Sequence, residues 1–271
     1  MTFNEFYMKF VTLVYDDDLD SQRYYLSMVE EHRKIPVEYL LSLGAVFIPN
    51  NDYITHYMGR ISEVPDFDLY RDGYCLWTHF VVFPVRNLIG DIVGLTGWDA
   101  GNKFKEISTG EKGLSMYKVS GKRLFKREKF FLSDTSLLKS SFDKRVIFIT
   151  DGVFDCISLS YRGIPTIALL GSTISNEILY FLQWYNFVYV VSDNDSAGVS
   201  LYHRIKQAIP STYRIMQSKT KDIEELLRSD LDCAITNKFR EILNNPVAMD
   251  VNLLGSRIRL DISRLSLGES Q

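Results

Sequence analysis

The sequence predicts an α/β protein, in which an α+β N-terminal half precedes a central parallel sheet flanked by helices. Two observations predict this class. Between residues 146 and 216, apolar segments of about five residues alternate with helical segments of about ten, the pattern of parallel β-α-β crossovers. Residues 74–97 instead hold two β-rich segments joined by a short turn, the pattern of an antiparallel hairpin. We therefore expect three domains: an N-terminal domain over 1–134, a parallel α/β domain over 135–230, and a helix with a tail over 231–271.

The composition is that of a globular protein outside membranes. The chain has 271 residues, 46% hydrophobic and 24% charged, which suffices for one large domain or two smaller ones. No apolar run approaches the roughly 20 residues of a membrane helix, and the N-terminus lacks the pattern of a signal peptide. We expect a cytoplasmic protein without a membrane partner. Cys75, Cys156 and Cys233 are far apart with no neighbouring histidine, so no structural zinc site is expected.

The first elements are helical. Asp20 or Ser21 can cap a helix that runs through about Arg33, so the acidic run at 16–20 is expected to be a solvated turn before it. Pro36 suits the first turn of a second helix. The elements expected next are that helix at 37–43, a strand at 45–48, and a loop with a short helix at 53–72.

The middle of the chain is β-rich and then basic. Residues 74–85 predict a buried strand, 87–90 a turn, and 91–97 the second strand of a hairpin. Residues 101–129 follow with nine basic and three acidic side chains, a local charge of +6 within a chain whose net charge is −3. This segment predicts a surface loop with short strands. Its basic side chains either bind nucleic-acid phosphates or form an ordinary solvated surface.

The second half carries the alternating pattern. A helix cap is expected at 133–136, and a final helix around 237–243. Between them, strands are expected at 146–149, 165–169, 187–191 and 212–216, and helices at 153–161, 175–184 and 197–208. Parallel sheets of this kind bind ligands at the carboxyl ends of their strands.

Carboxylates follow three of these strands. Asp151 follows the first, Asp193 and Asp195 follow the third, and Asp222 and Glu224 follow the last. Clustered carboxylates repel one another unless a cation neutralises them, and such hard oxygen ligands favour Mg²⁺ or Mn²⁺. Asp151 can also serve as a general acid or base. The alternative is an Asp-rich turn that only caps a helix, and Asp155 can be an ordinary polar residue of the helix that follows.

These acidic segments resemble a Toprim domain, the metal-binding fold shared by bacterial-type primases, topoisomerases and some nucleases. The segments that carry the resemblance are Thr150–Asp155, Ala168–Ser172 and Ser192–Gly198. Lys221–Leu226 resembles the acidic element with which primases close their cluster of carboxylates.

The N-terminal half resembles the corresponding part of primases. Similar segments there are Arg33–Gly44, Phe83–Asn87, Gly90–Gly97 and Lys105–Thr109, with Lys118 where another basic residue is expected. Two positions depart from the family pattern. Asp151 stands where the family has Glu, one methylene longer, and Trp98 stands where it usually has Arg. One phosphate contact is therefore either missing or supplied by another residue.

The resemblance implies the catalytic core of a primase, without the zinc-binding module and of the kind expected in a bacteriophage. Such an enzyme makes short RNA primers from ribonucleoside triphosphates on a single-stranded DNA template, using two or three Mg²⁺ or Mn²⁺ ions and no zinc. The implied catalytic residues are Asp151, Asp193 and Asp195; the implied metal ligands are Asp151, Asp193, Asp195, Asp222 and Glu224; and the implied nucleotide- or DNA-binding residues are Lys103, Lys105 and Lys118.

The implied partners are a replicative helicase or a separate zinc-bearing accessory protein, in the host bacterial cytoplasm. Two other functions stay open. The same carboxylates serve Toprim nucleases, which hydrolyse phosphodiesters instead of forming them. The departures at Asp151 and Trp98 fit a degenerate primase-like protein that only binds DNA or a replisome partner.

Overall fold

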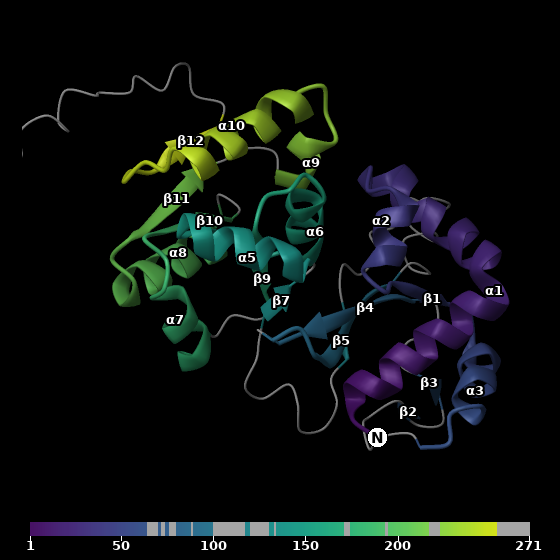
Figure 1. The fold of residues 1–271 in the computed structure, drawn as a ribbon. Helices are drawn as coiled ribbons and strands as arrows, with labels where there is room; N and C mark the ends of the chain where they lie inside the picture. The colour runs from purple at the N-terminus through teal and green to yellow at the C-terminus, as the bar shows by residue number, and fades with distance from the viewer. Residues whose placement is uncertain are drawn as a thin grey trace, which may run out of the picture.

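The computed structural model describes residues 1–63, 70–71, 74–75, 80–87, 89–99, 117–119, 130–132, 134–170, 174–192, 195–216 and 223–253. These residues form an antiparallel sheet with its own helices and a mostly parallel sheet with helices on both faces (Figure 1). The predicted α/β class is thereby confirmed. Within this part of the chain, no helix is long and apolar enough to cross a membrane.

The N-terminal half is built on a four-stranded antiparallel sheet in the order β1-β4-β5-β6. Its elements are α1 (Phe3–Arg33), α2 (Val37–Ser42), β1 (Val46–Ile48), α3 (Asn51–Gly59), β4 (Phe80–Arg86), β5 (Ile92–Asp99) and β6 (Tyr117–Val119), with a separate pair β2 (Tyr70–Arg71) and β3 (Tyr74–Cys75). The predicted hairpin is confirmed as β4 and β5, while the strand predicted over 74–85 is divided between β3 and β4.

Helix α1 begins far earlier than predicted. The side chain of Thr2 accepts a hydrogen bond from the Glu5 amide, and the Glu5 side chain bonds back to Thr2, so the helix starts with a capping box at Phe3. The prediction of a turn at 16–20 is wrong, because this acidic run lies inside α1. The only departure from helical geometry there is a kink at Asp18, whose φ is −142° and ψ 30°.

Polar side chains of α1 cover the outer edge of β1. Gln22, which is 0% exposed, donates from Nε2 to the Phe47 carbonyl oxygen at 2.9 Å and accepts from the Phe47 amide at 2.8 Å. The Tyr7 hydroxyl donates to the Gly44 carbonyl oxygen, and the Tyr15 hydroxyl to that of Ala45. The two contacts of Gln22 satisfy backbone groups at the edge of β1, which would otherwise be available to pair with another strand.

The second sheet has six strands in the order β12-β11-β10-β8-β9-β7. The strands are β7 (Phe130–Leu132), β8 (Val146–Thr150), β9 (Thr166–Leu169), β10 (Phe187–Val191), β11 (Thr212–Met216) and β12 (Val251–Asn252). The helices are α5 (Thr135–Lys144), α6 (Val153–Tyr161), α7 (Asn176–Leu182), α8 (Ser196–Ala208), α9 (Ile223–Leu227) and α10 (Asp232–Asn244). Every pairing is parallel except that of β7 with β9.

Helices cover both faces of this sheet. Apolar residues of α5, α7 and α8 pack together over one face, and those of α6, α9 and α10 over the other. The strands and helices predicted between 146 and 216 are confirmed to within two residues at each end. The sheet takes β7 and β12 from outside residues 135–230, and the division into three domains stays a prediction.

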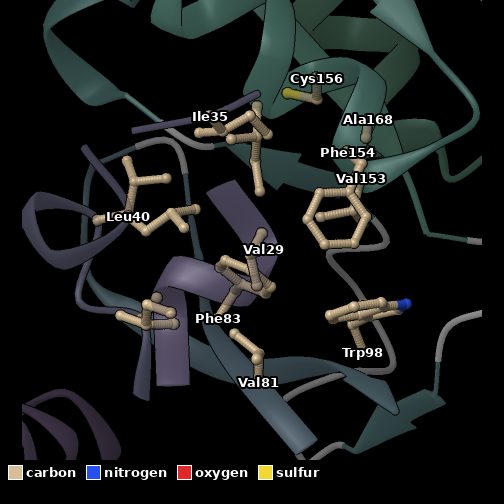
Figure 2. Packing of buried hydrophobic residues seen from close by; sticks show 14 of the residues in the cluster. Val29, Ile35, Leu40, Val81, Phe83, Trp98, Val153, Phe154, Cys156 and Ala168 are labelled. Atoms are coloured by element: carbon tan, nitrogen blue, oxygen red, sulfur yellow. The ribbon is translucent and has the colours of Figure 1, made fainter. Parts of the chain in front are cut away.

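One apolar cluster joins the two halves of the molecule (Figure 2). Its buried residues come from α1 and α2, from β4 and β5, and from α6 and β9 of the second sheet; they include Val29, Ile35, Leu40, Val81, Phe83, Trp98, Val153, Phe154 and Ala168. Because these buried side chains are packed against one another, the antiparallel sheet and the first turn of α6 are held in one arrangement.

Candidate metal centre at the carboxyl edge of the parallel sheet

Three neighbouring strands of the parallel sheet end at the same edge. Thr150, the last residue of β8, lies opposite Val191 of β10, and Val191 lies opposite Ile215 of β11. Adjacent strands are about 4.8 Å apart. The ends of these three strands therefore lie side by side, and the sequence places acidic residues after each of them.

A hydrogen bond between Thr150 and Gly152 stabilises the turn after β8. The Thr150 hydroxyl donates to the Gly152 carbonyl oxygen at 2.9 Å, and Gly152 is the N-cap of α6. Asp151, between them, has an exposed side chain. A Cβ on Gly152 would overlap Oδ2 of Asp155, so the Asp155 carboxylate lies directly against the glycine. Asp155, whose role the sequence left open, is thus brought to the same turn as Asp151.

The turn after β10 is stabilised by a similar hydrogen bond. The buried Ser192 hydroxyl donates to the Gly198 carbonyl oxygen at 3.1 Å. Asp195 caps α8, because its Oδ1 accepts a hydrogen bond from the Gly198 amide at 2.7 Å. The Asp195 side chain is exposed. Asp195 therefore has a structural role as a cap, and its second carboxylate oxygen can serve another ligand at the same time.

Helix α9 follows the third acidic segment in the sequence and is held by apolar packing and by one hydrogen bond. Ile223, Leu226 and Leu227 are buried in the cluster that covers the face of the sheet with α6 and α10. The Arg228 guanidinium donates from Nη1 to the His32 carbonyl oxygen at 2.7 Å, which ties the end of α9 to the end of α1. Glu224 lies within α9.

Several predicted site residues lie outside the described residues, namely Asp193, Asp222, Lys103 and Lys105. The backbone of Lys118 is in β6, opposite Thr96 of β5. Among the residues that the structure describes, no three His, Cys, Asp or Glu side chains are close enough together to hold a metal ion. The complete ligand set and the phosphate-binding lysines therefore stay predictions, while the edge at which Asp151 and Asp195 lie is shown.

Sequence reasoning missed the position of Arg33. This last residue of α1 places its guanidinium carbon 4.6 Å from the ring centroid of Phe154 and 5.8 Å from that of Trp98. Phe154 belongs to the first turn of α6, directly after the Asp151 turn. The sequence holds no signal for this contact, because the three residues come from three separate elements.

Comparison with known proteins agrees with this geometry. Residues 148–227 match the family described as Toprim-like. The DNA primase of Rickettsia bellii is 29% identical over 147 residues, which are 52% of this chain and 23% of that protein. The chain thus spans about a quarter of the length of the curated primases that it matches.

Solved primase structures share the fold. The RNA polymerase domain of the Mycobacterium tuberculosis primase DnaG superposes with a TM-score of 0.65 at 16% identity, covering 87% of this chain and 79% of that one. A DnaG primase catalytic domain solved with single-stranded DNA gives a TM-score of 0.62 at 16% identity, covering 88% and 82%. Residues 148–227 therefore form a Toprim-like domain, within a chain that has the fold of the DnaG primase catalytic core.

Proposed function

We propose that the chain is a DNA primase core, which makes short RNA primers on single-stranded DNA by metal-dependent nucleotidyl transfer during bacteriophage DNA replication. The observation that carries the proposal is the carboxyl edge of the parallel sheet, where β8, β10 and β11 end in register and acidic segments follow each of them. The fold of the DnaG core and the primase relatives support the same activity.

The donor set fits Mg²⁺ or Mn²⁺. Its members are carboxylates, which are the hard oxygen ligands these ions prefer, and the side chains of Asp151 and Asp195 both reach solvent. The residues proposed to hold two or three ions are Asp151, Asp155, Asp193, Asp195, Asp222 and Glu224. Such ions, when bound, would orient the triphosphate of the incoming nucleotide and lower the barrier to attack by the primer 3′-hydroxyl.

The chain itself would bind and orient the reactants. The N-terminus of α8, just beyond Asp195, presents backbone amides that favour the phosphates of a nucleotide. We assign Lys103, Lys105 and Lys118 to phosphates of the nucleotide or the template, and Asp151 to an ion or to the proton leaving the 3′-hydroxyl. The proposed ligands are single-stranded DNA and ribonucleoside triphosphates, with a helicase or a zinc-bearing protein as partner.

Primer synthesis by charge-removing variants tests the proposal. The full chain is incubated with single-stranded DNA, ribonucleoside triphosphates and Mg²⁺ or Mn²⁺. Asp195→Asn keeps a good N-cap for α8 while it removes a charge, so it should fold normally and yet lose nearly all synthesis. Asp193→Asn should behave alike. Asp143→Asn, on the exposed surface of α5, is the matched control. Wild-type synthesis by the first two variants would refute the metal site.

The same samples separate primase from nuclease. Labelled single-stranded DNA is incubated with Mn²⁺ in the absence of nucleotides, and its length is followed. Cleavage that Asp195→Asn abolishes would assign the edge to phosphodiester hydrolysis. If neither reaction occurs, and calorimetry with Mn²⁺ detects no binding, the chain is a primase-like binding protein, as the shorter Asp151 side chain would explain.

A further inference from the structure

The Arg33 guanidinium is held on a surface made of two aromatic rings. Its carbon lies over the Phe154 ring at 4.6 Å and over the Trp98 ring at 5.8 Å. Lys34 follows in the left-handed conformation, with φ 53° and ψ 34°, and its amide bonds to the Glu30 carbonyl oxygen. The helix therefore ends directly after Arg33, and the direction of the Arg33 side chain is set by a defined backbone.

The two rings cannot move freely. Trp98 is 3% exposed and Phe154 6%, and they meet edge to face, with centroids 5.7 Å apart and planes at 90°. Phe83 packs against Phe154 in the same way at 5.7 Å. Figure 2 shows both rings inside the cluster that joins the two halves of the molecule. An arginine side chain that such rings already hold in place loses little conformational entropy when it binds an anion.

The surface lies beside the acidic edge. Phe154 is three residues after Asp151, in the first turn of α6. On the other side, the Arg228 guanidinium bonds to the carbonyl oxygen of His32, the neighbour of Arg33, and so brings the end of α9 to the end of α1. The Arg33 guanidinium is thus held between the turn after β8 and the helix that follows the third acidic segment.

We propose that Trp98 and Phe154 are positioning residues, which fix Arg33 as a phosphate-binding residue beside the acidic edge. A guanidinium can stack with its flat face on an aromatic ring and still direct N–H groups to phosphate oxygens. Arg33 supplies the guanidinium, and the rings of Trp98 and Phe154 hold it in place. The inference rests on the proposed function only for the identity of the ligand, a single-stranded polynucleotide.

The test is a double-mutant cycle on DNA binding, measured with the full chain and labelled oligothymidylate at several salt concentrations. Arg33→Ala should weaken binding about tenfold, as expected for the loss of one charged hydrogen bond. It should also reduce the slope of log affinity against log salt by about 0.7, as expected for one phosphate contact on a single strand. Arg60→Ala is the matched control, because Arg60 also lies over an aromatic ring, that of Tyr57, but is the C-cap of α3.

Trp98 acts through Arg33 if the effects of the two changes are not additive. Trp98→Leu alone should weaken binding about threefold to tenfold, but in the Arg33→Ala background it should change affinity no further. Trp98→Phe, which keeps a ring, should restore most of the affinity. Additive losses, or Arg33→Ala binding as tightly as Arg60→Ala, would overturn the proposal.

Arg33→Lys covers the case in which Trp98→Leu does not fold, since it keeps the charge but loses the flat stacking surface. Binding like that of the wild type would show that the rings do not matter, whereas a loss of threefold or more supports them. Binding is measured without nucleotides, so the outcome is independent of primer synthesis. Non-additive effects of the Trp98 and Arg33 changes on DNA binding, in a chain that makes no primers, would refute the proposed function and support this inference. Additive effects in a chain that does make primers would refute this inference and support the proposed function.

Discussion

Replacing Gln22 by Leu tests how α1 covers the edge of the antiparallel sheet. The amide of Gln22 makes two hydrogen bonds to the backbone of Phe47 and a third to the Tyr53 hydroxyl, all between 2.8 and 2.9 Å and on a side chain that is 0% exposed. Leucine has a similar size but no polar atom. The Phe47 amide and carbonyl would therefore stay buried without partners.

Each buried polar group left without a partner costs about 1–3 kcal/mol, and the added apolar surface of leucine returns part of this. We expect Gln22→Leu to lower the free energy of unfolding by about 3 kcal/mol, a large fraction of the roughly 5–15 kcal/mol of a typical domain. At about 2–4 °C for each kcal/mol in a chain of this size, the thermal midpoint should fall by roughly 6–12 °C.

The assay is urea denaturation followed by circular dichroism, supported by a thermal scan. Gln207→Leu, an exposed position on α8, is the control and should change the midpoint very little. If Gln22→Leu shifts the urea midpoint no more than Gln207→Leu does, the hydrogen bonds to Phe47 do not contribute to stability, and the edge of β1 is protected by apolar packing alone.

Three further predictions concern the second half. Burial raises the pKa of Asp232, but hydrogen bonds and charge from Arg162 outweigh it and hold that pKa below its ordinary value. The pair therefore stabilises the fold above the ordinary carboxyl pKa of about 4, and this contribution is lost as the pH falls through the lowered pKa. Asp232→Asn should flatten the decline of the urea midpoint with acid below about pH 4. Gly152→Ala should displace the Asp155 carboxylate and reduce primer synthesis strongly, with a small change in the thermal midpoint; unchanged synthesis would exclude Asp155 from the site. Asp151→Glu extends an exposed carboxylate by one methylene and should raise the rate of primer synthesis, so a lower rate would show that the edge is shaped for aspartate.

Most of the parallel sheet could be predicted, because its longer strands each carry a local signal. β8, β10 and β11 are short runs rich in β-branched and aromatic residues with polar residues after them in the sequence, and β10 and β11 have the predicted ends. Helix α1 could not be predicted in full, because an acidic run within a helix has the same composition as a solvated turn. Strand β12 has only two residues, which is too short to leave a pattern.

The candidate site likewise has one part that the sequence predicts and one part that it does not. That Asp151 and Asp195 lie at one edge follows from the rule that parallel strands share their carboxyl ends, so alternation of strands and helices was sufficient to predict it. The contact of Arg33 with Trp98 joins residues from a helix and a hairpin that are distant in sequence. Nothing local in a sequence encodes such a pair, and only the packing of the two halves produces it.

The shared apolar cluster limits how the Toprim-like segment can be handled in isolation. A fragment that holds only residues 148–227 would present Val153, Phe154, Ala168 and Leu170 to water, because their packing partners belong to the N-terminal half. Exposed apolar surface of this kind drives aggregation. A fusion protein that carries the acidic edge would also need α1, α2 and the β4–β5 hairpin to cover these side chains. The smallest fragment expected to fold is therefore much larger than residues 148–227, which the family match covers.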